Sequence, residues 1–156
     1  MTASGPPTYC IDTSAFITAW NETYRPTNFA TFWQNLESLI TDGRAVACQE
    51  VKRELTSKDD AAGVWAKAQA SLFVELENEQ LLIAQELVKE FPSLAKQRLG
   101  RYRADGFVIA LAIWKGLTVV TAENRHGTDK IPTICEAKKV DCISLADMIE
   151  FEGWSF

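Results

Sequence analysis

The sequence predicts a doubly wound α/β fold, a three-layer α/β/α sandwich with a central parallel sheet of four or five strands. Short apolar runs alternate with helical patterns of about ten residues or more. One of these runs, LTVVT at residues 117–121, lacks polar alternation, as a strand covered on both faces should. A chain of 156 residues with 47% hydrophobic content favours one core. We therefore expect a flexible tail at residues 1–7 and a single domain over residues 8–156.

The first elements are a strand, a turn and a helix. Residues 8–12 (TYCID) form a short apolar run that ends in a carboxylate, and Thr13 and Ser14 then open a helical pattern over residues 15–20. A second helix is expected over residues 28–40. Its apolar stripe consists of Phe29, Phe32, Trp33, Leu36 and Ile40.

The next strand and helix are expected at residues 44–48 (RAVAC) and 49–56. Residues 59–99 are rich in Ala, Glu, Lys, Leu and Gln, so two or three helices and no strand are expected there. The segment 104–115 is apolar on nearly every side, which predicts a helix packed inside the core and capped by Gly116.

The carboxyl-terminal part repeats the alternation. The LTVVT strand should be followed by a helix at 131–138 that starts with a proline, and by a last strand at 140–144. A closing helix is expected over 144–151, with Ser144 as its cap.

Composition excludes several classes of protein. The net charge of −5 argues against a domain that coats nucleic acid, because such domains are strongly basic. No apolar run approaches the length of a membrane span, and the amino-terminal residues do not resemble a secretory signal, so a cytoplasmic protein is expected. The four cysteines show no C-x-x-C pairing and are interpreted as reduced thiols without a chemical role.

Carboxylates are expected at one edge of the sheet. Ligands of doubly wound folds bind beyond the carboxyl ends of the strands, and five acids follow strands or open the buried helix. They are Asp12, Glu50, Glu54, Asp105 and Glu123. Clustered carboxylates repel one another unless a cation lies among them, and an all-oxygen site selects Mg²⁺ or Mn²⁺.

Each acid also has a purely structural interpretation. Asp12 could cap the helix that follows it, and Asp105 could complement a helix dipole. Glu54 could pair with Lys58 one turn later, and Glu123 could be a solvated loop residue.

Four motifs together resemble the PIN-domain (PilT N-terminus) nucleases. They lie in the family's order over most of the chain, and further motifs are similar to a less characterised bacterial subgroup. The four are CIDTSAFI at 10–17, VKREL at 51–55, ADGFVIALA at 104–112 and VVTAEN at 119–124.

The resemblance implies catalytic, metal-binding roles for Asp12, Glu54 and Asp105. Glu123 stands where many members have Asp and is the fourth acid, with a side chain longer by one methylene. Glu50 is the reserve candidate for the second acid. Three hydroxyl residues could support the site, namely Thr13, Ser14 and Thr121.

The activity implied by the resemblance is cleavage of single-stranded RNA. One or two Mg²⁺ or Mn²⁺ ions would activate a water that attacks phosphorus, which needs no histidine base. The implied setting is the toxin of a toxin–antitoxin pair, with a protein antitoxin covering the acids; a homodimer is common in the family.

Basic and aromatic residues could contact such a substrate. A basic run without acids precedes Asp105 and is expected to hold the RNA backbone, unless it is a solvated face. It consists of Lys96, Arg98, Arg101 and Arg103. Trp20, Tyr24 and Trp33 could stack on bases, although their helical spacing favours the core.

Two alternatives belong to other classes. The chain could be a PIN-like module that has lost catalysis and binds RNA or protein. Glu123 in place of the family's Asp and the pI near 4.9 favour this alternative. A phosphoaspartate receiver or phosphatase fits less well, because Thr13 and Ser14, and not a second acid, follow Asp12.

Overall fold

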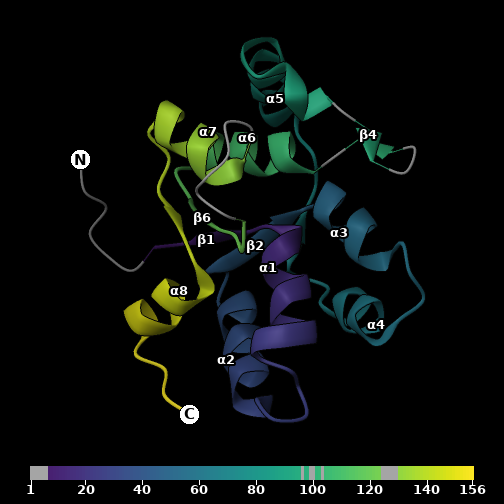
Figure 1. The fold of residues 1–156 in the computed structure, drawn as a ribbon, viewed down its shortest axis with the longest axis vertical. Coiled ribbons are helices and arrows are strands. Elements are labelled where there is room, and N and C mark those ends of the chain that lie inside the picture. Colours follow the sequence, from purple (N-terminus) through teal and green to yellow (C-terminus); the bar gives the residue numbers. More distant parts are fainter. Residues whose placement is uncertain (1–6, 96, 99–100, 103, 124–129) are drawn as a thin grey trace.

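The computed structural model describes residues 7–95, 97–98, 101–102, 104–123 and 130–156. A five-stranded parallel sheet lies at its centre, in the order β3-β2-β1-β6-β7 (Figure 1). The strands are β1 (Tyr9–Ile11), β2 (Ala45–Cys48), β3 (Phe73–Val74), β6 (Thr118–Val120) and β7 (Cys142–Ile143). The chain runs outward from β1 to β3 and then returns to the other side of β1, which is doubly wound topology, as predicted.

Helices cover both faces of the sheet and complete three layers (Figure 1). One side carries α5 (Asn78–Glu90), α6 (Asp105–Lys115) and α7 (Ile131–Lys138). The other side carries α1 (Thr13–Thr18), α2 (Ala30–Thr41), α3 (Gln49–Thr56), α4 (Ala61–Ala68) and α8 (Leu145–Glu152). The predicted α/β/α sandwich is confirmed. No helix among the described residues is long and apolar enough to cross a membrane.

Helix α6 is the central helix of its layer, because it packs on β1, β2 and β6. Its residues from Val108 to Ala112 are buried, which confirms the prediction of a helix inside the core. The Cys10 thiol of β1 donates to the Val108 carbonyl at 3.6 Å. Gly116 ends the helix with a φ of 67°, a left-handed conformation that glycine adopts without strain.

Aromatic rings fill the space between α1, the following π-helix η1 (Ala19–Thr23), α2 and α4. The Trp20 and Trp65 rings each lie 4.9 Å from the Trp33 ring, centroid to centroid, and both meet it edge to face. Tyr24 stacks on Phe32 at 4.6 Å. The core interpretation of Trp20, Tyr24 and Trp33 is therefore correct, because each ring packs against other aromatic rings.

Two expectations about elements were wrong. Residues 59–99 contain strands as well as the helices α4 and α5: β3 joins the edge of the main sheet, and β4 (Gln97–Arg98) pairs with β5 (Arg101–Tyr102). Each has two residues, too few to produce a detectable alternation. The first helix also begins earlier than expected, at Thr13, and continues as a π-helix.

The closing helix is fixed at both ends. Ser144 and Asp147 form a capping box at the start of α8, as the sequence predicted for Ser144. Near its end, Glu152 accepts hydrogen bonds from Tyr9 at 2.6 Å and from Arg44 at 2.6 and 2.8 Å. These contacts lie at the amino-terminal ends of β1 and β2, away from the edge where Asp12 follows β1.

Candidate active site

A pocket of about 230 Å³ opens at the carboxyl ends of β1 and β6, the two strands between which the direction of winding reverses. Asp12 follows β1, and Glu123 follows β6 by a short loop. Doubly wound folds bind their ligands at this position. The pocket is lined by Asp12, Thr13, Ser14, Ile17, Thr18, Glu54, Asp105 and Glu123.

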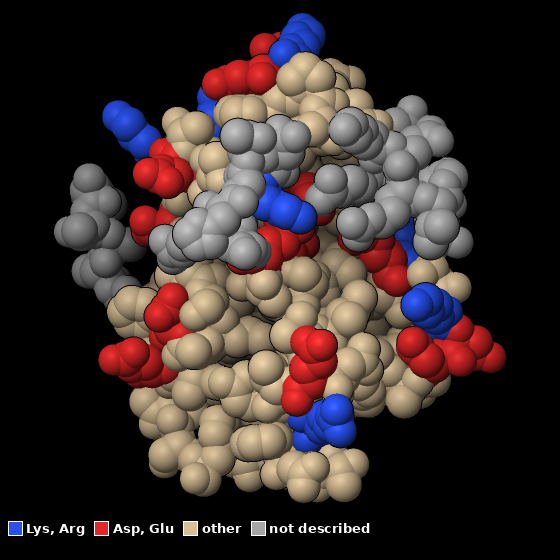
Figure 2. Space-filling view, in the orientation of Figure 1, with Lys and Arg blue, Asp and Glu red and all other residues tan. Residues whose placement is uncertain are grey.

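The four predicted acids thus meet from four separate segments of the chain. Figure 2 shows this face of the molecule, with acidic and basic side chains in its middle. The part of the face over α1 and α2 is mostly uncharged.

Asp12 is buried, with 2% of its surface exposed. It occupies the N-cap position of α1, yet its side chain makes no capping hydrogen bond, so the structural interpretation of this acid was wrong. Its Oδ2 atom instead accepts hydrogen bonds from Ser14 Oγ at 2.6 Å and Thr121 Oγ1 at 2.9 Å. Two hydroxyls from different strand ends therefore hold one carboxylate oxygen.

The same hydroxyls also fix the loop that follows β6. Ser14 Oγ accepts the Ala122 N–H at 3.1 Å, and Thr121 Oγ1 accepts the Glu123 N–H at 3.1 Å. Because each hydroxyl uses its single proton on Asp12, it can serve as an acceptor for these backbone groups. The carboxylate and the backbone before Glu123 are thereby part of one network.

The pKa of Asp12 is raised to about 7. Burial is the largest cause, the negative charges of Asp105 and Glu123 also raise the pKa, and the Ser14 and Thr121 hydrogen bonds lower it. Repulsion between Asp12 and its neighbouring acids thus outweighs the support from the hydroxyls. A cation in the pocket would reverse this balance.

Asp105 is the first residue of α6 and is 6% exposed. Its position at a helix amino terminus favours a negative charge, which agrees with the dipole interpretation of this acid. It also lines the pocket beside Asp12, so the two interpretations hold together.

The two glutamates of the pocket are each held by a hydrogen bond. Glu54 Oε1 accepts from Thr13 Oγ1 at 2.5 Å, which links α3 to the start of α1. Glu123 Oε1 accepts the backbone N–H of Ile131, the first residue of α7, at 2.9 Å. Thr13, Ser14 and Thr121 therefore all contact site acids.

The reserve acid Glu50 is not among the described residues that line the pocket. It is buried and lies 3.5 Å from the guanidinium of Arg53, while its Oε1 atom has no hydrogen-bond partner among the described residues. Lys96 and Arg103 of the predicted basic run lie outside the described residues. For Arg98 and Arg101 only the backbone, in β4 and β5, is described.

Sequence reasoning missed Ile17 and Thr18, which line the pocket from α1. Ile17 lies one turn after Thr13, so its spacing on the helix could have indicated this. Its side chain is 42% exposed and gives the pocket an apolar wall beside the acids.

The pocket is lined by carboxylate and hydroxyl oxygens, which are the ligands that a hard divalent cation prefers. Burial and, after it, the charges of Asp105 and Glu123 raise the pKa of Asp12, so a bound cation would favour its ionised form. In the described residues, no three acid, histidine or cysteine side chains are already arranged as a metal-ligand group.

A family profile matches residues 9–156, nearly the whole chain. It is described as a domain of unknown function, DUF4411. The chain belongs to the DUF4411 family. No curated protein matches the sequence.

The DUF4411 chain shares its fold with a chain in the crystal structure of VapBC2 from Rickettsia felis, bound to a DNA fragment from their promoter. The two have a TM-score of 0.55 and 16% sequence identity, over 88% of this chain and 98% of the other. At this identity the likeness concerns the fold. The predicted PIN-like fold is confirmed.

Proposed function

We propose that this DUF4411 protein is a divalent-metal-dependent endoribonuclease that cleaves single-stranded RNA. The observation that supports it is the convergence of Asp12, Glu54, Asp105 and Glu123 on one pocket at the switch point of a PIN-like sheet. Carboxylates from four segments, one of them buried with a raised pKa, are costly to gather without a cation.

Asp12 and Asp105 would be the principal holders of one or two Mg²⁺ or Mn²⁺ ions, with Glu54 and Glu123 completing the set. When bound, such ions supply a water of lowered pKa and neutralise charge that develops on the phosphate. Ser14 and Thr121 keep the Asp12 carboxylate oriented, and Thr13 does the same for Glu54. Lys96, Arg98, Arg101 and Arg103 would bind the RNA backbone.

The biological setting that we propose is a toxin–antitoxin pair, since the fold is shared with a chain of the VapBC2 complex. A protein antitoxin would cover the acidic pocket and so block access of RNA. Adding the product of a neighbouring reading frame to the purified protein should then suppress RNA cleavage. Unchanged cleavage in the presence of a bound product would contradict this part of the proposal.

The decisive experiment replaces Asp12 and Asp105 singly by asparagine and measures cleavage of single-stranded RNA in Mn²⁺. Each change removes a charge but keeps the shape, so we expect cleavage to fall by about 100-fold or more. Asp59→Asn is the matched control, because Asp59 is exposed and does not line the pocket. Equal cleavage by all three variants would refute the proposal.

A second candidate function is a binding module for RNA or protein that has lost catalysis. It is favoured by Glu123, whose Oε1 atom already accepts the Ile131 N–H. Such a module should keep its fold and its ligand when Asp12 or Asp105 is changed to asparagine.

A further inference from the structure

Two of the four cysteines lie together where α7 turns back into β7. Lys139 ends α7 with a φ of 58°, and the Val140 N–H donates to the Cys135 carbonyl at 2.8 Å. This turn brings β7 alongside the last turn of the helix. As a result, Cys135 on α7 and Cys142 on β7 lie side by side, close enough for Cys142 to raise the pKa of Cys135.

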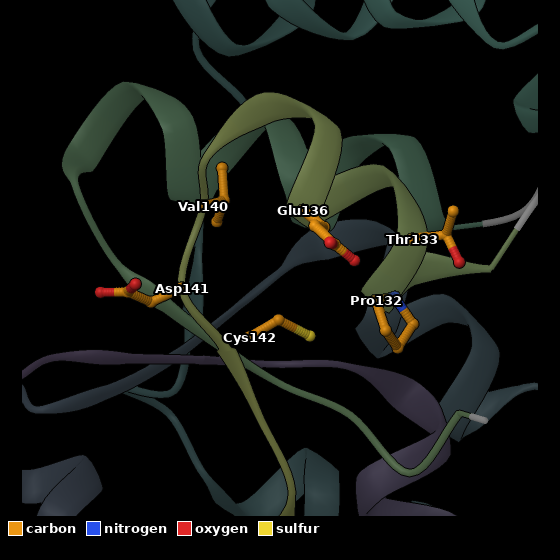
Figure 3. Close-up of a pocket in the computed structure, with 6 residues that line it drawn as sticks. All are labelled: Pro132, Thr133, Glu136, Val140, Asp141 and Cys142. Atoms are coloured by element: carbon orange, nitrogen blue, oxygen red, sulfur yellow. The ribbon is translucent and has the colours of Figure 1, made fainter. Parts of the chain in front are cut away.

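The two thiols differ in access. Cys135 is fully buried, whereas Cys142 is partly exposed and lines a cavity of about 280 Å³. Figure 3 shows the Cys142 side chain extending beneath α7, toward Glu136 and Pro132. A small molecule in this cavity could therefore reach the sulfur of Cys142 before that of Cys135.

The contact between the two residues keeps Cys135 protonated. The contact with Cys142, together with burial, raises the pKa of Cys135 far above that of an ordinary thiol. Cys135 is therefore not the nucleophile, and Cys142, at the cavity wall, is the thiol that an oxidant can reach.

The other two cysteines provide an internal comparison. Cys10 and Cys48 are buried on the neighbouring strands β1 and β2, and burial raises the pKa of both thiols. The Cys10 thiol is engaged by the Val108 carbonyl. Neither residue lines a cavity among those described, so neither offers a reactive thiol.

We propose that Cys135 and Cys142 form a redox-active dithiol that hydrogen peroxide converts into an intramolecular disulfide. This inference is independent of the proposed ribonuclease activity. It departs from the sequence-based interpretation of the cysteines as inert packing residues only for Cys135 and Cys142.

The reaction proceeds in two balanced steps. The Cys142 thiolate attacks one oxygen of hydrogen peroxide, which breaks the O–O bond and gives a sulfenic acid and, after protonation, water. The sulfur of Cys135 then attacks the sulfenic sulfur, and its proton leaves with the hydroxide as a second water. Peroxide is the oxidant, and the two thiols are oxidised to one disulfide.

The test treats the reduced, folded protein with peroxide, blocks remaining thiols in denaturant and maps peptides by mass spectrometry. We expect a disulfide between Cys135 and Cys142, reversed by dithiothreitol, with Cys10 and Cys48 recovered as thiols. In Cys135→Ser, Cys142 should stop at the sulfenic acid and react with dimedone. In Cys142→Ser, Cys135 should remain reduced.

Three results would overturn the inference: no oxidation of Cys142, oxidation of Cys10 or Cys48 at the same rate, or a disulfide only between separate chains. The wild-type mapping needs no variant, so the inference stays testable if a serine variant fails to fold.

Discussion

Asp12 interacts with more of the charged and polar groups of the pocket than its hydrogen bonds alone suggest, because nearby acids also act on it. Its carboxylate is buried, is held by two hydroxyls and faces the charges of Asp105 and Glu123. Without a cation, burial and the two neighbouring charges favour the protonated form and raise its pKa to about 7, against the effect of the two hydroxyls. The site therefore favours a bound cation. This gives two predictions about single residues.

The first concerns stability against pH in the metal-free protein. The pKa of Asp12 is about 7 when folded and about 3.9 when unfolded, so the folded state retains a proton that the unfolded state releases. Its contribution to stability should be lost as pH rises from about 4 to 7, a loss on the order of a few kcal/mol. Urea unfolding in EDTA at pH 5 and pH 8 measures this.

The comparison with Asp12→Asn isolates the effect, because the variant lacks the titrating group. It should lose less stability than wild type between pH 5 and 8. Glu152, whose pKa is lowered by Arg44, contributes with the opposite sign and cancels in the difference. Identical pH dependence in the two proteins would show that Asp12 titrates normally.

The second change is Thr121→Val, which keeps the shape and removes the hydroxyl. Asp12 loses a hydrogen bond that lowers its pKa, so the pKa should rise. Carboxyl NMR titration of Asp12 would measure this without any assay of activity. Thr118→Val is the control, because Thr118 begins β6 while Thr121 follows its other end, and it should leave the titration unchanged.

Most residues of the candidate site could be predicted from the sequence, because an acidic or hydroxyl residue directly after an apolar run indicates the end of a strand. Asp12 and Glu123 each follow a β-branched or apolar run, and Asp105 opens an apolar helix. Helix geometry alone could not decide whether Glu54 or Glu50 is the second acid of the site, since both lie on the same helix one turn apart. The pocket wall at Ile17 was missed because an apolar residue on a helix reads as core.

At the scale of elements, α8 depends on one carboxylate at its end. The Glu152 carboxylate accepts hydrogen bonds from the Tyr9 hydroxyl and from two Arg44 N–H groups, and its side chain is only 11% exposed. Arg44 in turn is 24% exposed, so the ion pair is only partly screened by water. This triad joins the closing helix to the starts of β1 and β2.

Replacing Glu152 by alanine should destabilise the protein by about 2 kcal/mol, because Arg44 and Tyr9 are left without their shared acceptor. Glu150→Ala is the matched control on the exposed face of the same helix and should change stability by less than about 0.5 kcal/mol. Urea unfolding of both variants gives the comparison. Equal losses would mean that the helix, and not the ion pair, carries the stability.

Long elements were predictable and short ones were not. The helix at Ile131–Lys138 was found with its bounds, because a proline starts it and a polar turn ends it. Strands of two residues, such as β3, are defined by their partners and not by their own sequence. The π-helical continuation of α1 has no sequence signal that we recognise.

For the molecule as a whole, the winding of the sheet brings the four acids together. A ligand that binds only the folded state must stabilise the entire domain. Millimolar Mn²⁺ should therefore raise the midpoint of thermal unfolding, by roughly 5 to 10 °C if the ion is present at about a hundred times its dissociation constant.

The same measurement separates the two candidate functions. Asp12→Asn and Asp105→Asn should abolish the Mn²⁺ effect, while Asp59→Asn should keep it. A wild-type protein that gains no stability from Mn²⁺ or Mg²⁺ would favour the non-catalytic module.

Arg44 also donates to the carbonyl of Pro7 at 3.3 Å, so one guanidinium contacts the beginning of the described chain and, through Glu152, its last helix. A short peptide could join these two regions into a circularised polypeptide, with new termini opened in a surface loop elsewhere. Affinity handles or fluorophores attached near either region would project away from the acids, which leaves the pocket accessible when the protein is immobilised.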